Sequence, residues 1–211
     1  MISPLGWFGI QKFDLLAPIY DWIMQYLEKN TLSKCRTRFV PMVEGKVLDL
    51  AVGTGPNIEY YPMDRIESIT MIDLSSGMLN KAREKVRTEM KDNLSKFELM
   101  EAPCESLPFQ NETFDTVLSI DVLCSVDDQK KTFDEAYRVL KTGGTAFFVE
   151  HFKTYNFWTD VFLSMVTLIT YPLVGASMVR ETDKEIGKSK FQITERGKVK
   201  GTNFEYFICK K

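Results

Sequence analysis

The sequence predicts an α/β protein built on a doubly wound, mostly parallel seven-stranded sheet that ends in a C-terminal antiparallel hairpin. Three observations predict this fold class. Short apolar runs alternate with segments of helical periodicity in the middle of the chain, a tight glycine turn follows the first run, and residues 190–210 alternate apolar with polar side chains. No linker or internal repeat divides the 211 residues, so we expect one domain over residues 1–211.

Five short apolar runs are the expected parallel strands, and they are Lys46–Ala51, Ser68–Leu74, Phe97–Ala102, Phe114–Asp121 and Thr145–Phe152. Helical segments between the runs imply β-α-β crossovers, and near-continuous apolar character suits strands covered on both faces. Two alternating stretches, Lys190–Lys198 and Thr202–Lys210, predict the hairpin that closes one edge of the sheet.

Apolar spacing predicts the helices. One helix is indicated by apolar residues at every fourth position, which are Met78, Ala82, Val86 and Met90. The next is indicated by i, i+3, i+4, i+7 spacing at Phe133, Ala136, Tyr137 and Leu140. We expect Gly143–Gly144 to form the C-cap of this second helix, and a short helix to start at Pro56 and stop at Pro62.

Composition excludes several classes of function. Lys and Arg number 27 against 29 Asp and Glu, and this balance lacks the basic excess usual in proteins that bind nucleic acid. The four cysteines are far apart in the sequence, so neither a zinc knuckle nor a disulfide framework is expected. His151 is the single histidine, which excludes a multi-histidine metal site, and we predict no metal.

The glycine turn at Gly53–Gly55 follows the first expected strand, and Asp49 lies inside that strand. Ligands of open parallel sheets bind at the carboxyl ends of the strands, where glycine lets the backbone approach closely. Asp73 ends the next strand and can accept both hydroxyl hydrogens of a ribose. Ile58 stands where the dinucleotide fingerprint has its third glycine, so a nucleoside without phosphates fits better than a pyrophosphate.

Four segments together resemble the successive motifs of class I S-adenosylmethionine-dependent methyltransferases, and they are VLDLAVGTGPN (47–57), MIDLSSGMLNKAREK (71–85), ESLPFQNETFDTVLSIDVL (105–123) and RVLKTGGTAFFVEH (138–151). The resemblance covers residues 13–152 and is to the UbiE-like group, methyltransferase type 11. It leans toward phosphatidylethanolamine N-methyltransferases and membrane-associated thiol methyltransferases. It implies a Rossmann-like fold and S-adenosylmethionine as cofactor, with S-adenosylhomocysteine as product.

The same resemblance implies a set of cofactor-binding residues, which are Asp49, Ala51, Gly53, Gly55, Asp73, Leu74, Met78, Cys104, Glu105, Ser119 and Ile120. Within that set, Asp73 would hold the ribose hydroxyls, while Leu74 and Met78 would pack near the adenine. Ala51 replaces the usual first glycine of the turn. Glu105, or the backbone at Cys104, would accept from the adenine amine.

Three residues are the catalytic candidates, namely Tyr20, Asp121 and His151. His151 follows the fifth strand and Asp121 ends the fourth, so both would lie at the substrate end of the sheet. A hydrogen-bonded structural histidine is an equally open interpretation of His151, and a helix-entry residue is the alternative interpretation of Asp121. Tyr20 belongs to a segment, 17–21, that resembles the Tyr-Asp element of the family's N-terminal lid, which we place at residues 1–30.

Two apolar flanks indicate a small lipophilic acceptor. Residues 7–27 and 155–179 are rich in aromatic and aliphatic side chains and would cover an apolar pocket. We expect residues 155–180 to form a substrate-side insertion. The 19 uncharged residues 161–179 approach the length of a membrane span, but Pro172 and Gly175 interrupt them, and we expect a buried or interfacial element.

The expected activity is methyl transfer from S-adenosylmethionine to a thiol, a phospholipid amine or a quinone precursor. Two alternatives stay open: a non-catalytic S-adenosylmethionine-binding regulatory module, and a nicotinamide-dependent oxidoreductase, which Ile58 disfavours. We expect a cytoplasmic protein, with peripheral membrane contact left open. The sequence does not indicate the oligomeric state.

Overall fold

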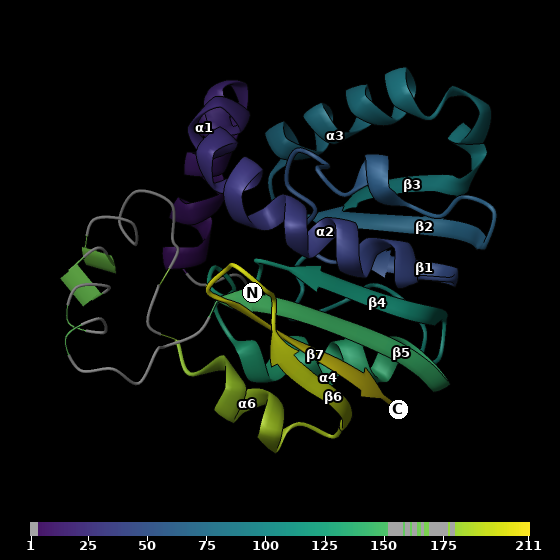
Figure 1. Cartoon of the computed structure of the whole chain (residues 1–211). Helices are drawn as coiled ribbons and strands as arrows, with labels where there is room; N and C mark the ends of the chain where they lie inside the picture. Colours follow the sequence, from purple (N-terminus) through teal and green to yellow (C-terminus); the bar gives the residue numbers. More distant parts are fainter. Residues whose placement is uncertain are drawn as a thin grey trace.

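The structure is a computed structural model that describes residues 4–151, 158, 161, 164–165, 167–168, 177 and 180–211, with side chains from residue 13 onward. Its strands are β1 (Gly45–Asp49), β2 (Ile66–Asp73), β3 (Phe97–Glu101), β4 (Phe114–Ile120), β5 (Leu140–His151), β6 (Gln192–Lys198) and β7 (Phe204–Lys210). They form one sheet in the order β3-β2-β1-β4-β5-β7-β6 (Figure 1).

Strands β1 to β5 are mutually parallel, whereas β7 runs antiparallel to both β5 and β6. This topology confirms the predicted fold class, including the C-terminal hairpin. The expected strand ranges agree with the observed ones to within two residues at most ends. The exception is β5, which starts at Leu140 instead of Thr145.

Helices cover both faces of the sheet (Figure 1). On one face α2 (Ser33–Phe39) and α3 (Ser76–Glu89) pack against a cluster that contains Val47 and Leu118. On the other face α4 (Gln129–Val139) and α6 (Thr182–Lys188) pack against a cluster that contains Leu48 and Val117. Neighbouring strand residues therefore belong to opposite layers, which is why the strand sequences are apolar throughout.

The predicted cap at Gly143–Gly144 is wrong. Helix α4 ends at Val139, and β5 begins at the next residue and contains both glycines. Leu140 is fully buried and is paired with Phe114 of β4, so sheet pairing overrides the helical spacing that includes Leu140. Gly143 takes a φ of 81°, where the register between β4 and β5 shifts.

The expected helix between Pro56 and Pro62 is reduced to one 3-10 turn, η3 (Ile58–Tyr60). The chain around it is held by local turns, such as the Ile58 amide that donates to the Gly55 carbonyl at 3.2 Å. Three further short elements are η1 (Glu28–Leu32), η2 (Val40–Met42) and η4 (Lys91–Lys96).

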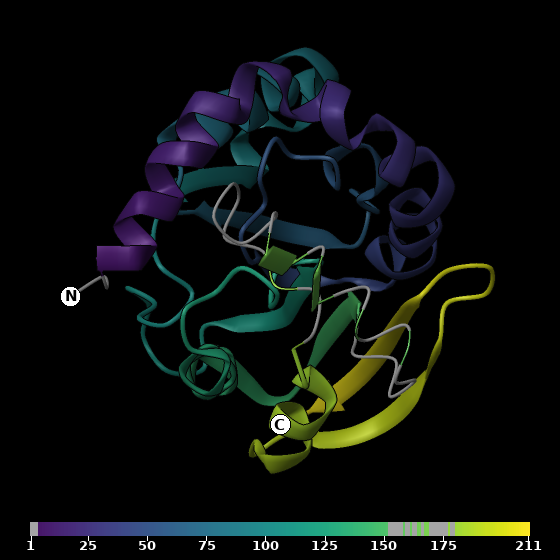
Figure 2. The ribbon, with the colours of Figure 1, turned by 90° about the vertical axis from the view of Figure 1, so that its left-hand side faces the viewer.

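The N-terminal segment forms the long helix α1 (Pro4–Leu27), which runs alongside α3 (Figure 2). Asp14 of α1 accepts hydrogen bonds from the Ser75 hydroxyl at 2.6 Å and from the Gly77 amide at 2.8 Å. A carboxylate at the first turn of α3 is favourable because free amides and the helix dipole make that end positive.

No helix within the described residues has the length and apolarity to cross a membrane.

Most of the predicted insertion at 155–180 lies outside the described residues. Of the positions that are described there, Trp158, Met165 and Leu168 are exposed. Whether the remainder forms a buried or interfacial element stays a prediction.

Candidate functional site

The register of the sheet brings the ends of three strands together. Asp49, the last residue of β1, is paired with Met71 of β2 and Leu118 of β4. The chain then leaves the sheet through a turn in which Ala51, Gly53 and Gly55 have φ values of 46°, 56° and 78°. Two glycines supply this left-handed backbone without strain, and Ala51 adopts it despite its Cβ.

Asp73, at the end of β2, is joined directly to the glycine turn. Its Oδ2 accepts from the Gly53 amide at 2.8 Å, and its Oδ1 accepts from the Ser75 amide at 2.8 Å. Burial raises the pKa of Asp73, against the opposing effect of these two amide bonds. Each carboxylate oxygen keeps a second lone pair, so the side chain can still accept two hydroxyl hydrogens.

Asp49 is buried beneath the turn. Its Oδ2 accepts hydrogen bonds from the Asn57 amide at 2.8 Å and from the Tyr61 hydroxyl. Among the described residues its Oδ1 has no partner. Burial raises the pKa of Asp49 to about 6 despite these bonds. A buried acceptor without a partner costs free energy, and it is the feature expected where a ligand or a water completes the bonding.

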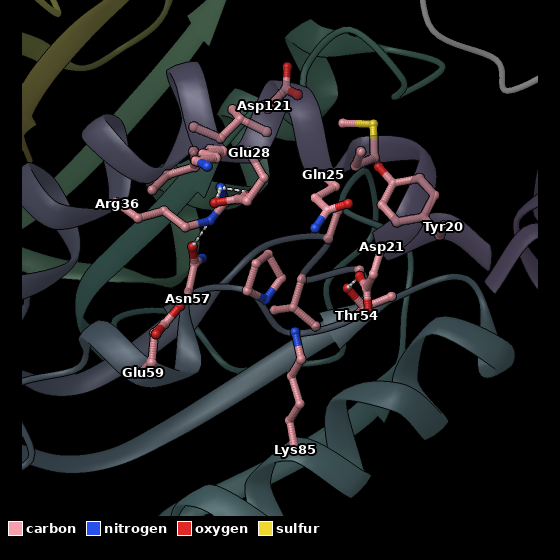
Figure 3. A pocket seen from close by; sticks show the side chains of 18 of the residues that line it. Tyr20, Asp21, Gln25, Glu28, Arg36, Thr54, Asn57, Glu59, Lys85 and Asp121 are labelled. Atoms are coloured by element: carbon pink, nitrogen blue, oxygen red, sulfur yellow. Dashed lines mark hydrogen bonds and ion pairs between the residues drawn. The ribbon is translucent and has the colours of Figure 1, made fainter. Parts of the chain in front are cut away.

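A cavity of about 400 Å³ opens beside the turn (Figure 3). Its walls come from the turn itself, from the end of β4 and from α1 and α2. The predicted site residues among its lining are Tyr20, Ala51, Gly53, Ile120 and Asp121. The Thr54 hydroxyl of the turn donates a hydrogen bond to Asp21 Oδ1 of α1 at 2.6 Å, and this bond connects the helix to the turn.

Arg36 is a lining residue that the sequence reasoning missed. Its Nη1 lies 2.5 Å from Glu28 Oε2, and its Nε donates to Asn57 Oδ1 at 2.9 Å. Only 5% of Arg36 is exposed, and Lys85 points toward the same space from α3 (Figure 3). The surrounding segment SKCRTRF (33–39) is mostly polar, so the sequence carries no signal that Arg36 is buried.

The remaining predicted cofactor residues, Asp49, Gly55 and Asp73 included, are not part of the cavity lining. Leu74 is half-buried, while Met78 and Cys104 are buried. Glu105 accepts from the Asp127 amide at 2.8 Å, so the β4–α4 connection engages one of its carboxylate oxygens. Ser119 is fully buried and bonds Glu150 at 3.2 Å.

Two of the catalytic candidates, Tyr20 and Asp121, line the cavity, and the third, His151, contacts Asp121 from outside the lining. Asp121 Oδ1 lies 3.0 Å from His151 Nδ1, and Asp121 has a φ of 61°. Burial alone would lower the pKa of His151, but the hydrogen bond and the charge of Asp121 outweigh it and raise that pKa. In Figure 3 the Asp121 carboxylate points away from Asn57 and Thr54. Burial raises the pKa of Tyr20, with a further increase from the charge of Asp121.

Comparison with known proteins identifies the family. Residues 48–148 match the model of the family described as a methyltransferase domain. The chain is 31% identical, over 154 residues, to the ubiquinone/menaquinone biosynthesis C-methyltransferase UbiE of Geotalea daltonii, which covers 70% of the chain. The chain spans 64% of the length of that relative.

A second relative and a solved structure extend the match. The UbiE protein of Xanthomonas oryzae pv. oryzae is 30% identical over 180 residues, which are 82% of this chain and 70% of the relative. The methyltransferase-like chain solved in complex with the Haloferax volcanii Trm112 methyltransferase activator superposes with a TM-score of 0.72. That structure is 17% identical and covers 94% of this chain and 96% of its own, which shows the fold. By these matches, the chain belongs to the family of S-adenosylmethionine-dependent methyltransferases.

Proposed function

We propose that this chain transfers a methyl group from S-adenosylmethionine to a small lipophilic acceptor. The observation that carries the proposal is the glycine turn joined to Asp73 beside a cavity of about 400 Å³. When bound, S-adenosylmethionine supplies a methyl group on a sulfonium, a leaving group that an N, O, S or C nucleophile can displace. The residues of the chain then position the two reactants and exclude water.

The donor set fits an adenosyl sulfonium. Asp73 offers two acceptor positions for ribose hydroxyls, and a Cβ at Gly53 would meet no atom within 4 Å. The orphaned Oδ1 of Asp49 offers an acceptor for an amino group, and Arg36 offers a cation for a carboxylate. We assign Ser119 and Ile120 to the methionine end, and Leu74, Met78, Cys104 and Glu105 to the surroundings of the adenine.

Tyr20, Asp121 and His151 are the residues that we propose to contact the acceptor. The hydroxyl, carboxylate and imidazole can hold an acceptor by its N–H, O–H or S–H group and so orient the attacking atom. Both Tyr20 and Asp121 line the cavity, and His151 is bonded to Asp121. Helix α1, which carries Tyr20, would act as the lid.

The acceptor is proposed to be apolar. Leu15, Ile19, Trp22, Ile23 and Tyr26 lie along one face of α1 and are between 49% and 81% exposed. An exposed apolar stripe of this size indicates contact with an apolar partner, and it lies on the helix that borders the cavity but outside the cavity lining itself. The two C-methyltransferase relatives, whose names place them in ubiquinone and menaquinone biosynthesis, support a quinone precursor as the first acceptor to examine.

A methyl-acceptor screen tests the proposal. Purified protein is incubated with methyl-labelled S-adenosylmethionine and a quinone precursor, phosphatidylethanolamine or an alkyl thiol, each beside a hydrophilic analogue. Label should enter at least one lipophilic acceptor and not its analogue. Calorimetry with S-adenosylmethionine and NAD accompanies the screen. Cofactor binding without transfer to any acceptor would favour the regulatory module, and binding of NAD alone would refute the proposal.

Gly53→Ala and Gly55→Ala should differ in how much they lower the free energy of unfolding, and Gly53→Ala should also weaken cofactor binding. The new methyl of Gly53→Ala enters open space, so we expect weaker binding and a stability loss of about 1–2 kcal/mol from the left-handed backbone. At Gly55 a Cβ lies 2.5 Å from Ile58 Cδ1 and 3.1 Å from Ala82 Cβ, which adds about 1–3 kcal/mol from overpacking. Urea unfolding and cofactor titration check both variants. A Gly53→Ala protein with unchanged affinity would contradict the assignment.

The same stripe on α1 supports our proposal of peripheral membrane contact. The full chain should sediment with liposomes, and the double variant Leu15→Gln/Trp22→Gln should bind at least about tenfold less because two exposed apolar side chains lose their burial in lipid. The matched control is Met42→Gln/Leu94→Gln, two positions each 44% exposed elsewhere on the surface. Equal binding by both double variants, or no binding by the unaltered chain, would remove α1 as a contact.

A further inference from the structure

Four side chains with metal-binding atoms meet next to the cavity. Asp121, Cys124, Glu150 and His151 each offer one carboxylate, thiol or imidazole atom, and these four atoms lie within 4.8 Å of one another. Asp121 and Cys124 come from the segment that leaves β4, and Glu150 and His151 end β5. Because β4 and β5 are adjacent parallel strands, their carboxyl ends bring the two pairs together.

Two atoms of this group lack partners among the described residues. Glu150 is 1% exposed, and its Oε1 accepts from the Val122 amide at 2.9 Å while its Oε2 bonds nothing. The Nε2 of His151 is also buried without a hydrogen bond. Burying a carboxylate oxygen and an imidazole nitrogen without hydrogen bonds destabilises the fold. A cation that binds both atoms would remove this unfavourable free energy.

The electrostatic surroundings favour a positive ligand. Three of the four side chains are acids, because Asp121 and Glu150 are carboxylic acids and Cys124 is a thiol, and their ligand atoms lie within 4.8 Å of one another. A bound divalent ion would offset this accumulation of negative charge and stabilise the thiolate.

We propose that Asp121, Cys124, Glu150 and His151 bind one divalent transition-metal ion of the Zn²⁺ type. A mixed set of sulfur, nitrogen and oxygen donors suits Zn²⁺, Co²⁺ and Ni²⁺, whereas Mg²⁺ and Ca²⁺ prefer oxygen alone. Tetrahedral Zn²⁺ places its donors roughly 3.3–3.8 Å apart, so side-chain shifts of about 1 Å close the site from its present spread of 4.8 Å.

The site differs from what the sequence predicts. A single histidine excludes a multi-histidine site, but one imidazole is enough when a thiolate and two carboxylates complete the set. Residues 121 and 151 are 30 positions apart, so no ligand spacing is visible in the sequence. The binding of the ion does not depend on the proposed methyl transfer. Since Asp121 also lines the cavity, the ion would border the proposed acceptor position.

Co²⁺ titration of the full chain, stripped with a chelator and dialysed, tests the proposal. We expect one Co²⁺ per chain, with visible d–d bands of a tetrahedral site and a near-ultraviolet thiolate-to-Co²⁺ band, all abolished by Zn²⁺. Cys124→Ser should lose the near-ultraviolet band, and Glu150→Gln should bind Co²⁺ about tenfold more weakly or worse. The control is Cys209→Ser, a buried thiol in β7 outside the group.

Circular dichroism and a cooperative thermal transition establish that each variant folds. The proposal fails if the unaltered chain gives no tetrahedral bands, or if Cys124→Ser keeps the near-ultraviolet band. It also fails if Cys209→Ser loses that band as completely as Cys124→Ser. If a variant does not fold, the Co²⁺ spectrum of the unaltered chain by itself decides whether the proposal stands. Parallel calorimetry with S-adenosylmethionine reports on the cofactor pocket, so failure of the metal site and failure of the proposed methyl transfer are distinguished.

Discussion

Replacing Asp73 by alanine should weaken S-adenosylmethionine binding by about 10²-fold or more. Asp73 is proposed to accept two ribose hydroxyls, and hydrogen bonds to a charged acceptor are each worth about 1.5–3 kcal/mol. The variant also removes the acceptors for the Gly53 and Ser75 amides, which order the turn. Isothermal calorimetry measures the change directly.

Two further variants serve as comparisons in this experiment. Asp73→Asn keeps the shape of the side chain and one acceptor oxygen, so its loss of affinity should lie between those of the native chain and the alanine variant. Asp64→Ala removes an exposed aspartate from the loop before β2 and should bind normally. An Asp73→Ala protein that is folded and binds the cofactor with native affinity would overturn the ribose assignment.

Breaking the Arg36–Glu28 pair should strongly destabilise the fold at the cavity. Arg36→Met leaves Glu28 without its cation, and burial already raises the pKa of Glu28 against the effect of Arg36. Removing one partner of a buried pair costs about 3–5 kcal/mol, and the partial exposure of Glu28 reduces the expected cost to about 2–3 kcal/mol. Urea unfolding followed by circular dichroism gives the free energy of unfolding.

A double-mutant cycle isolates the interaction. Arg36→Met/Glu28→Gln should cost less than the sum of its single variants, with a coupling energy of about 1–3 kcal/mol. The exposed Lys130–Asp134 pair, at 2.7 Å on α4, is the matched cycle and should couple by about 0.5 kcal/mol or less. Additive effects at Arg36 and Glu28 would mean that the buried contact contributes nothing to stability.

The parallel strands could be predicted because each is short, apolar and followed by a turn residue. The error at Gly143–Gly144 arose where Leu140 satisfies a helical spacing and a strand pairing at once. Local pattern cannot decide between these, because the deciding contact with Phe114 is 26 residues away in the chain. The same limit explains why a helix was expected where η3 forms a single turn.

Part of the candidate site could likewise be anticipated. Asp73 ends β2 and Gly53 lies in the turn that follows β1, so a parallel sheet places both at the same edge. Arg36 and Glu150 were not anticipated, because their roles depend on burial and on partners from other elements. Glu150 is a charged residue in an apolar strand, whereas Arg36 stands among polar residues, and only packing decides whether either side chain faces water.

Helix α1 forms one wall of the cavity and is tied to the rest of the domain by Asp14 at the start of α3 and Asp21 at Thr54. If α1 is the lid that we propose, it would have to move aside before a molecule in the cavity could exchange with solvent. Those carboxylate bonds are worth about 1.5–3 kcal/mol each. We therefore expect the release of S-adenosylhomocysteine to limit the rate of turnover. Substitution of Asp14, which is far from the reacting atoms, should then change kcat.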